Sequence, residues 1–298
     1  MEFNAQTLRA ANIGFNAAFN AGLAMAASMY GAVATTVPSS TKTQEYGWLG
    51  DFPDFREWVG DRVINNLSKH GYTLVNKDYE NTIGVDRNDF DDDNLGMYTP
   101  MFQQFGYTAK VFPDRLVWPV LKNGFTNLCY DGQYFFDTDH PVLNEAGKEV
   151  AVANTDGGNG TPWFLLDTSR PLKPIIYQER KPFTNLVRMD SETDEAVFTK
   201  KKLRYGLDGR ASVGYGFWQM AWGSRQPLDA TRYEAARVGL LTMKGDYGRP
   251  LAIQPKLLVV PPTLEGAARR LIANEKNAAG ADNEWYKTAD IMVVPWLA

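Results

Sequence analysis

The segment Cys129–Val142 carries the residue types most able to do chemistry: a thiol, three carboxylates and an imidazole. A cysteine and a histidine in contact form a nucleophile and its base, provided that the thiol is exposed and its pKa is lowered. Cys129 and His140, with Asp137 and Asp139 beside the imidazole, could therefore serve a soluble cysteine hydrolase. The competing interpretation is structural, because a free cysteine flanked by large apolar side chains is more often a buried packing residue.

Metal and nucleotide chemistry find less support in the sequence. The run Asn88–Asn94 holds four aspartates, but a calcium loop starting at Asp89 would need glycine in place of Asn94 and glutamate in place of Pro100. Acidic residues there are better explained as the start of a helix, whose dipole they complement. The glycine cluster 157–160 lacks the Lys-Ser/Thr ending of a phosphate-binding loop. We therefore expect no catalytic residue, no metal ligand and no cofactor.

The composition is that of a chain with an ample core: 298 residues, 44% of them hydrophobic, one cysteine and a net charge of −4. One cysteine excludes an internal disulfide and a multi-cysteine zinc site, as suits a reducing cytosol. No apolar run approaches the roughly 20 residues that span a bilayer. The Ala-rich N-terminal run also lacks the basic start of a signal peptide. We expect no membrane partner.

The run 200–204, Lys-Lys-Lys-Leu-Arg, is the prominent basic cluster. In a strand, Lys200, Lys202 and Arg204 would share one face. A solvated strand face is the plain interpretation. The alternatives are ion pairs with the acids of a neighbouring subunit, or contacts to phosphates.

Residues 4–30 predict an amphipathic helix, because their apolar side chains recur at steps of three and four. The stripe includes Phe15, Phe19 and Leu23. An Ala-rich helix with one apolar edge must lie against something. It is either an ordinary core helix or an arm that packs on a neighbouring subunit, and we favour the arm.

The pattern predicts a long excursion from the body: an extended strand over 41–49, a helix over 55–67 and a returning strand over 72–85. The helix is near the lower limit of about 12–15 residues for stability in isolation, so it needs a partner. Large side chains often dominate such contacts. On this excursion they are Trp48, Phe55, Trp58 and Val59.

The rest of the pattern mixes helices and strands without regular alternation, which is typical of the α+β class. A helix over 95–123 should be kinked or divided by its prolines. The other predicted elements are strands at 163–166, 175–177, 197–205, 211–222, 257–260 and 290–294, and helices at 231–241 and 264–273.

Three blocks of the chain resemble the major head subunits of Mu-like phages. They are Phe55–Ile64 with Thr82–Arg87 downstream, Leu128–Pro141, and Gly248–Pro262. The second block is long and specific, whereas the third also resembles a wider set of tailed-phage capsid proteins. The resemblance covers roughly residues 8–298.

The resemblance implies a capsid fold of the Hong Kong-97 type, with an arm, an E-loop, a spine helix, a peripheral domain and an axial domain. We place the boundaries on the predicted elements. They are 1–40 for the N-terminal arm, 41–87 for the E-loop, 88–162 for the spine helix and the following peripheral segment, 163–222 for the peripheral strands, and 223–298 for the axial domain.

The resemblance also implies a function: a major capsid protein whose hexamers and pentamers enclose double-stranded DNA. Its partners would be further copies of the chain, scaffold, portal and decoration proteins, and packaged DNA through weak non-specific contacts. It would be assembled in the bacterial cytoplasm and reside in the virion. The alternatives are the hydrolase that uses Cys129 and His140, and a portal, scaffold or decoration protein.

One physical expectation underlies this interpretation: the chain exposes apolar extensions that only other copies can cover. A single chain that folded both extensions onto its own body would contradict it. The predicted subunit-interface residues are Phe15, Phe19, Leu23, Trp48, Phe55, Trp58, Val59, Lys200, Lys202 and Arg204.

Overall fold

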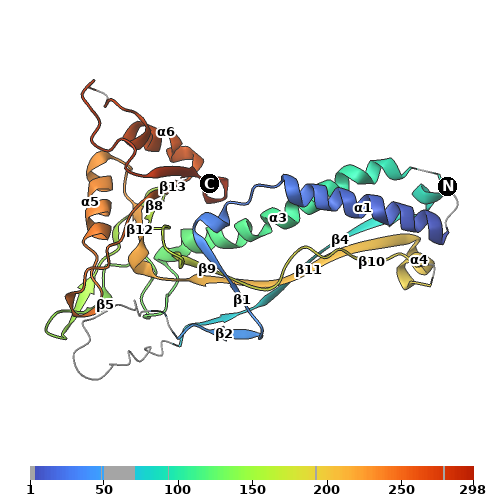
Figure 1. The fold of residues 1–298 in the computed structure, drawn as a ribbon, viewed down its shortest axis with the longest axis horizontal. Coiled ribbons are helices and arrows are strands. Elements are labelled where there is room, and N and C mark those ends of the chain that lie inside the picture. Colours follow the sequence, from blue (N-terminus) through green and yellow to red (C-terminus); the bar gives the residue numbers. More distant parts are fainter. Residues whose placement is uncertain (1–3, 48, 50–70, 93, 192, 278) are drawn as a thin grey trace.

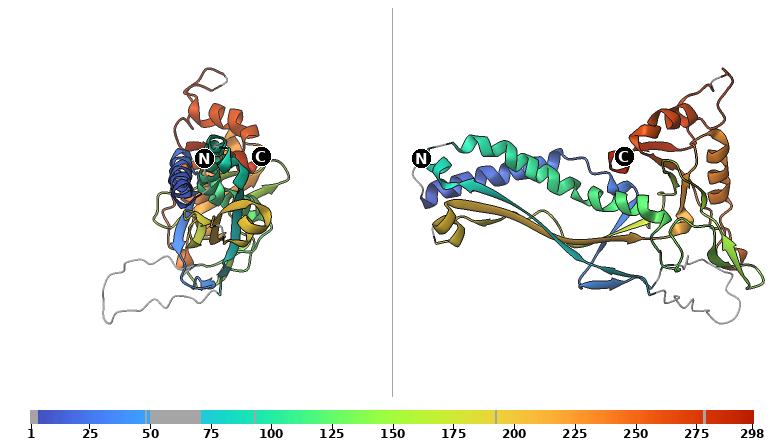
Figure 2. Two further views of the ribbon diagram at one scale, coloured as in Figure 1. Left: turned by 90° about the vertical axis from the view of Figure 1, so that its right-hand side faces the viewer. Right: turned by 180° about the vertical axis from the view of Figure 1, so that it is seen from behind.

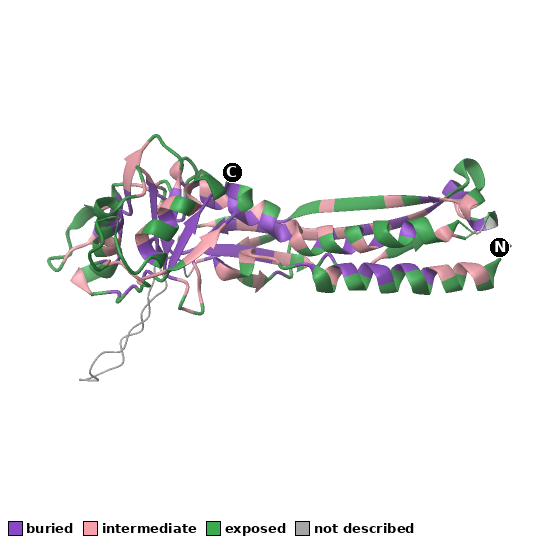
Figure 3. Cartoon of the chain, turned by 90° about the horizontal axis from the view of Figure 1, so that it is seen from above, coloured by how far each residue is buried: buried purple, intermediate pink, exposed green. Residues whose placement is uncertain are grey.

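The computed structural model describes residues 4–47, 49, 71–92, 94–191, 193–277 and 279–298. It has two parts, a long limb and a more compact body at one end (Figures 1 and 3). The limb consists of two helices lying over a sheet, and the body is built on a second sheet. Within the described residues, no helix is both long enough and apolar enough to cross a membrane.

The limb sheet has the strand order β1-β9-β11-β10, and β4 also pairs with β11. Along β11 burial alternates: Leu203 and Tyr205 face the helices, while Lys202 and Arg204 face away. This is the period of two expected of a sheet covered on one face. The limb strands are β1 (Ala34–Pro38), β4 (Lys77–Asp86), β9 (Ile175–Lys181), β10 (Val187–Met189) and β11 (Lys202–Tyr215).

Helix α1 (Ala5–Met25) lies along helix α3 (Tyr98–Lys122), and Figure 2 shows the pair on one face of the limb sheet. The helices meet at their backbones, because a Cβ added at Gly22 or at Gly106 would overlap main-chain atoms of the partner helix. Glycine permits this close approach. The N-terminal arm of the sequence prediction is therefore folded onto its own chain.

A buried carboxylate holds the chain where it leaves α1. Asp114, on α3, is 1% exposed and accepts hydrogen bonds from the backbone N–H groups of Met29 and Tyr30 and from the hydroxyl of Ser28. Trp118 Nε1 donates to the same carboxylate at 3.1 Å. The carboxylate thus ties the segment after α1 to the middle of α3.

The prolines do not divide α3, which is one helix of 25 residues with Pro113 and Pro119 inside it. An interior proline removes a backbone donor and costs about 3 kcal/mol. Here Pro113 is itself buried, and Val117, Trp118 and Leu121 follow it into the core with no exposed surface. Packing of this face offsets the lost hydrogen bonds.

The body sheet has the strand order β14-β13-β8-β12-β7. Its central strands β8 and β13 are buried at every residue, so both faces of the sheet are covered. Segment 163–166 forms β8, which pairs with β12 and β13 and so belongs to the body sheet and not to the limb sheet. The body elements are β7 (Thr155–Gly158), β8 (Trp163–Leu166), β12 (Ala221–Arg225), β13 (Leu257–Val260), β14 (Asp290–Val293), α5 (Ala230–Leu241) and α6 (Glu265–Ala268).

The expectation of a strand over 197–205 is wrong in its first half. Residues Glu195–Lys200 form helix α4, and Lys201, at φ 48°, turns the chain into β11. One strand, β11, runs from Lys202 to Tyr215 and so joins parts of the two separate strands expected at 197–205 and 211–222. Shorter elements complete the fold: α2 (Arg87–Asp91), the pair β2 (Thr43–Glu45) and β3 (Thr73–Val75), and the hairpin β5 (His140–Leu143) and β6 (Glu149–Val152).

Candidate functional site

Cys129 and His140 do come together, but Asp131 lies between them. The thiol of Cys129 donates to Asp131 Oδ1 at 2.9 Å, and His140 Nδ1 lies 2.7 Å from Asp131 Oδ2. The imidazole stacks on Trp218 with ring centroids 3.9 Å apart. Cys129 is 5% exposed, and the side chains of Asp131 and His140 are 6% and 0% exposed. The cluster is inside the protein.

The electrostatics of this cluster oppose nucleophilic catalysis. Burial, and then the charge of Asp131, raise the pKa of the Cys129 thiol well above its ordinary value. Burial alone would raise the pKa of Asp131, but the hydrogen bonds from His140 and Cys129 outweigh it and lower that pKa. The carboxylate therefore stays charged and the thiol stays protonated. A hydrolase needs the reverse, an exposed thiolate.

The cluster also fits a hydrogen-bond network better than a metal site. The three possible ligand atoms lie within 4.8 Å of one another, but the carboxylate contacts are 2.7 and 2.9 Å. Two ligand atoms around one tetrahedral zinc ion lie about 3.3 Å or more apart. The sequence analysis singled out Asp137 and Asp139 and missed Asp131. The Asp131-Gly132 pair, where Gly132 has a φ of 87°, is a turn signal that could have pointed to Asp131.

The predicted arm anchors are already covered within the chain. Phe15 stacks on Phe102 with centroids 4.3 Å apart, and Phe19 meets Phe105 edge-on at 5.7 Å. Phe15 and Phe19 are 3% and 1% exposed, and Leu23 is partly buried against the same core. The expectation that these side chains are exposed for a neighbour is wrong, because α3 of the same chain covers them.

The predicted loop anchors Trp48, Phe55, Trp58 and Val59 lie outside the described residues. The root of this excursion is described, and a buried polar side chain joins its two stems. Gln178, on β9, is fully buried: its Oε1 accepts from the Tyr46 hydroxyl at 2.8 Å, and its Nε2 donates to Asn76 Oδ1 at 2.7 Å. The outgoing and returning stems are thus bound to one strand.

The basic residues do not lie on one strand face as expected. Lys200 ends α4, whereas Lys202 and Arg204 share the outer face of β11. The αL turn at Lys201 separates the two groups. Within the part of the chain that the structure describes, none of Lys200, Lys202 and Arg204 forms an ion pair.

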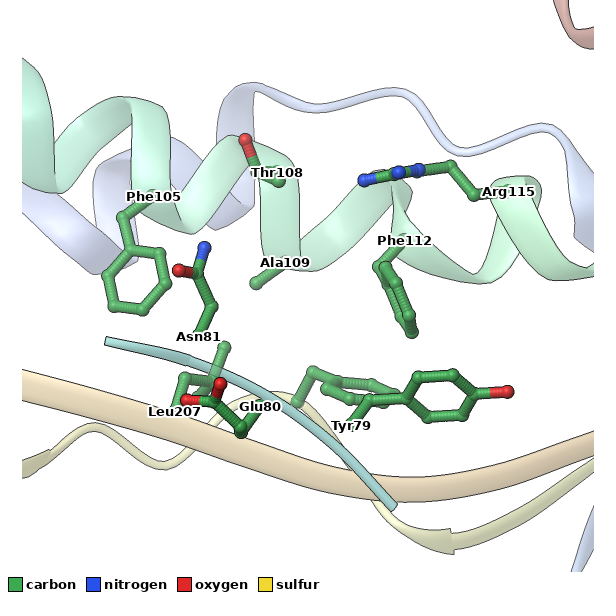
Figure 4. A pocket seen from close by; sticks show the side chains of 10 residues that line it. Tyr79, Glu80, Asn81, Phe105, Thr108, Ala109, Phe112, Arg115 and Leu207 are labelled. Carbon is green, nitrogen blue, oxygen red and sulfur yellow. The ribbon is translucent and has the colours of Figure 1, made fainter. Parts of the chain in front are cut away.

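An apolar groove that the sequence did not reveal opens between α3 and the edge strand β4 (Figure 4). Its volume is about 230 Å³. Aromatic rings line it, with Phe112 packed edge-on against Tyr79 at 5.0 Å and against Phe183 at 4.9 Å. Glu80 and Arg115 also line it. These residues come from three distant segments, so only the fold brings them together.

Comparison with known proteins shows which family this chain resembles in sequence. A family model described as the Mu-like prophage major head subunit gpT matches residues 8–297. The chain is 44% identical over 290 residues to the Mu-like prophage FluMu major head subunit of Haemophilus influenzae. It is 41% identical over 288 residues to the major capsid protein of Escherichia phage Mu. Each of these alignments covers 94% of both sequences.

Solved structures agree with the sequence comparison. A chain from the procapsid of bacteriophage JBD30 superposes with a TM-score of 0.88 at 44% identity, over 99% of this chain and 100% of its own. A chain from the JBD30 capsid superposes with a TM-score of 0.77 at 34% identity, over 92% of both. The expected α+β fold of the Hong Kong-97 capsid type is confirmed. The chain therefore belongs to the Mu-like prophage major head subunit gpT family.

Proposed function

We propose that copies of this chain assemble as hexamers and pentamers into an icosahedral phage head that encloses double-stranded DNA. The observation that carries the proposal is the superposition of nearly the whole chain on a subunit of an assembled procapsid. The JBD30 capsid has also been solved decorated with minor capsid protein trimers. We accordingly propose decoration, scaffold and portal proteins as further partners, assembly in the bacterial cytoplasm, and the virion as the final location.

The limb and the body support a division into functional domains. We propose that the limb sheet with α3 forms the peripheral domain and spine, and that the body forms the axial domain. Strand pairing then assigns 163–166 and 221–225 to the body and leaves 175–215 in the limb. Residues 1–40 stay the proposed arm and 41–87 the proposed E-loop, although β4, at the end of that range, is part of the limb sheet.

The proposed interface residues on the loop are still Trp48, Phe55, Trp58 and Val59. Lys200, Lys202 and Arg204 are proposed to meet acids of a neighbouring subunit or, less specifically, phosphates of packaged DNA. The buried thiol supports a structural role for the chain and no catalytic one, because burial, and then the charge of Asp131, raise the pKa of Cys129.

Expression of the full chain with its scaffold tests the function. Sedimentation and electron microscopy should show large closed particles, whereas persistent monomers would contradict the proposal. Trp58→Ala tests the loop assignment separately. We expect a folded chain that forms no particles, because interface aromatics often carry much of the contact energy. Normal particle yield from Trp58→Ala would remove the loop from the interface and leave the function standing.

A further inference from the structure

Phe198 is an aromatic side chain that the fold of a single chain does not use. It is 81% exposed, the highest value among the exposed large hydrophobic side chains of the described residues. It belongs to α4, the short helix that Figure 1 shows at the outer end of the limb. Single exposed apolar side chains are common, but large, well-anchored side chains are also the ones that carry much of the contact energy in interfaces.

Helix α4 holds Phe198 in a defined position. Its neighbours Ala196 and Val197 are 3% and 1% exposed, so they anchor the helix on the limb while Phe198 points outward. The N–H of Lys201, in the left-handed conformation, closes the helix by donating to the carbonyl groups of Ala196 and Val197. Because the turn is already held in place, little conformational freedom would be lost when a partner buries Phe198.

The groove between α3 and β4 has the size and lining to receive such a ring. Figure 4 shows Phe105 and Ala109 at one end, and Phe112 facing Tyr79 at the other. An apolar cavity of about 150 Å³ already admits benzene, and this groove has about 230 Å³. Aromatic walls offer the edge-to-face contacts that rings prefer. Because Phe198 is exposed, it does not occupy the groove of its own chain.

Charges beside the ring and beside the groove are complementary. Glu195 and Lys200 lie on α4 on either side of Phe198 in the sequence, and Arg115 and Glu80 line the groove. None of these four side chains forms an ion pair within the described residues. Arg115 instead lies over the Phe112 ring at 5.9 Å. Opposite charges at both ends of a contact fix its orientation and speed its formation.

We propose that Phe198 of one copy inserts into the groove between α3 and β4 of a second copy. The inference rests on the proposed assembly function and adds a specific contact to it. Ring and groove lie at different places on one chain, so the contact is heterologous: each copy can give one ring and receive another. Repeated heterologous contacts close into rings or extend a lattice, as a shell requires.

Crosslinking tests the geometry directly. Chains carrying Phe198→Cys are mixed with chains carrying Thr108→Cys, since Thr108 lines the groove and is half-buried. The mixture is assembled at a protein concentration above the raised threshold expected for loss of the ring. Under mild oxidation with diamide, assembled mixtures should give disulfide-linked dimers on a non-reducing gel, and either variant alone should not. Native Cys129 supplies little background, because it is buried and its pKa is raised.

Substitution tests the contribution of the contact. Phe198→Ala should raise the protein concentration needed for assembly at least about 30-fold, the loss expected of a hot-spot residue. Thr108→Trp, which fills the groove, should have the same effect, and Phe198→Leu should recover part of it. Met25→Ala, at a side chain 72% exposed on α1, is the matched control and should assemble normally. Unchanged circular dichroism and thermal midpoints would show that each variant folds.

The outcomes separate the two levels of the proposal. If wild-type chain assembles but Phe198→Ala does so equally well, or if intact mixed particles yield no crosslink, the contact is wrong and the assembly function stands. If wild-type chain forms no particles with its scaffold, both fall together.

Discussion

The body and the limb bury their sheets in different ways. In the body, β8 and β13 are buried at every position, as expected of strands covered on both faces. In the limb, only the residues of β11 and β4 that face α1 and α3 are covered, and the opposite face of β11 carries side chains such as Lys202 and Arg204. The body completes its core alone, while the limb leaves a sheet face and an edge strand for other molecules to meet.

This difference changes where the assembly surface of a shell subunit should be sought. The apolar stripe of α1 is used inside the chain, so the argument that the arm must find a neighbour was wrong for Phe15 and Phe19. Membership of the head-subunit family rests instead on similarity over nearly the whole chain. The surfaces left for neighbours are the groove beside β4, the end of the limb at α4, and the outer face of the limb sheet.

The largest expected effect comes from separating the two limb helices. In Gly106→Val the new side chain overlaps the carbonyl group of Phe19 on α1, so the helices must move apart. We expect the free energy of unfolding, measured by urea denaturation, to fall by at least about 3 kcal/mol.

The matched control for this change is Gly14→Ala on α1, where nothing lies within 4 Å of the added Cβ. It should stabilise by up to about 1 kcal/mol through helix propensity. Equal denaturation midpoints for the two variants would mean that α1 and α3 do not touch at their backbones.

A cavity in the body should be almost as costly. Leu258→Ala removes a fully buried side chain from β13 and should cost about 2–5 kcal/mol. Because the body core is closed on both faces, we expect the loss both in the isolated chain and in assembled particles. Leu241→Ala, at a side chain that is 51% exposed, should change the unfolding midpoint little. A loss of unfolding free energy as large as that of Leu258→Ala would contradict the assignment of Leu258 to the core and Leu241 to the surface.

Removing the polar junction at the root of the excursion should have a smaller effect. Gln178→Leu removes the acceptor of the Tyr46 hydroxyl and the donor to Asn76 Oδ1, at a cost of about 1–3 kcal/mol. Limited proteolysis should then cut between the two stems faster than in wild-type chain. Unaltered cutting would show that the stems are held by other contacts.

The smallest effect concerns the pH dependence of the Asp131 network. The folded-state pKa of Asp131 is lowered, so its ionised form stabilises the fold at neutral pH, and this contribution is lost as pH falls from its ordinary value of 3.8 through the folded value. Wild type should therefore exceed Asp131→Asn in unfolding free energy at pH 7, and the gap should shrink toward pH 3. A gap that is constant with pH would indicate that the charge is unimportant.

Local patterns predicted much of the architecture. The apolar stripe of α1, the buried strand at 257–260 and the helix capped by Asp229 all lie where the pattern placed them. The α4 helix was missed because six residues are too few for a period to be read, and Lys201 is an unusual residue for a left-handed turn. The prediction that prolines would kink or divide α3 failed to foresee one continuous helix, because the local cost of the prolines is outweighed by packing against residues that are distant in the sequence.

Sequence by itself determined that one face of α1 is buried, that Cys129 lies among large apolar neighbours, and which family the chain resembles. Only the tertiary structure decided what covers that face and which carboxylate the thiol meets: α3 of the same chain, and Asp131. The physical reason is that hydrophobic burial has no direction. An amphipathic pattern states that a surface must leave water, while the identity of the covering surface depends on contacts between residues far apart in the chain.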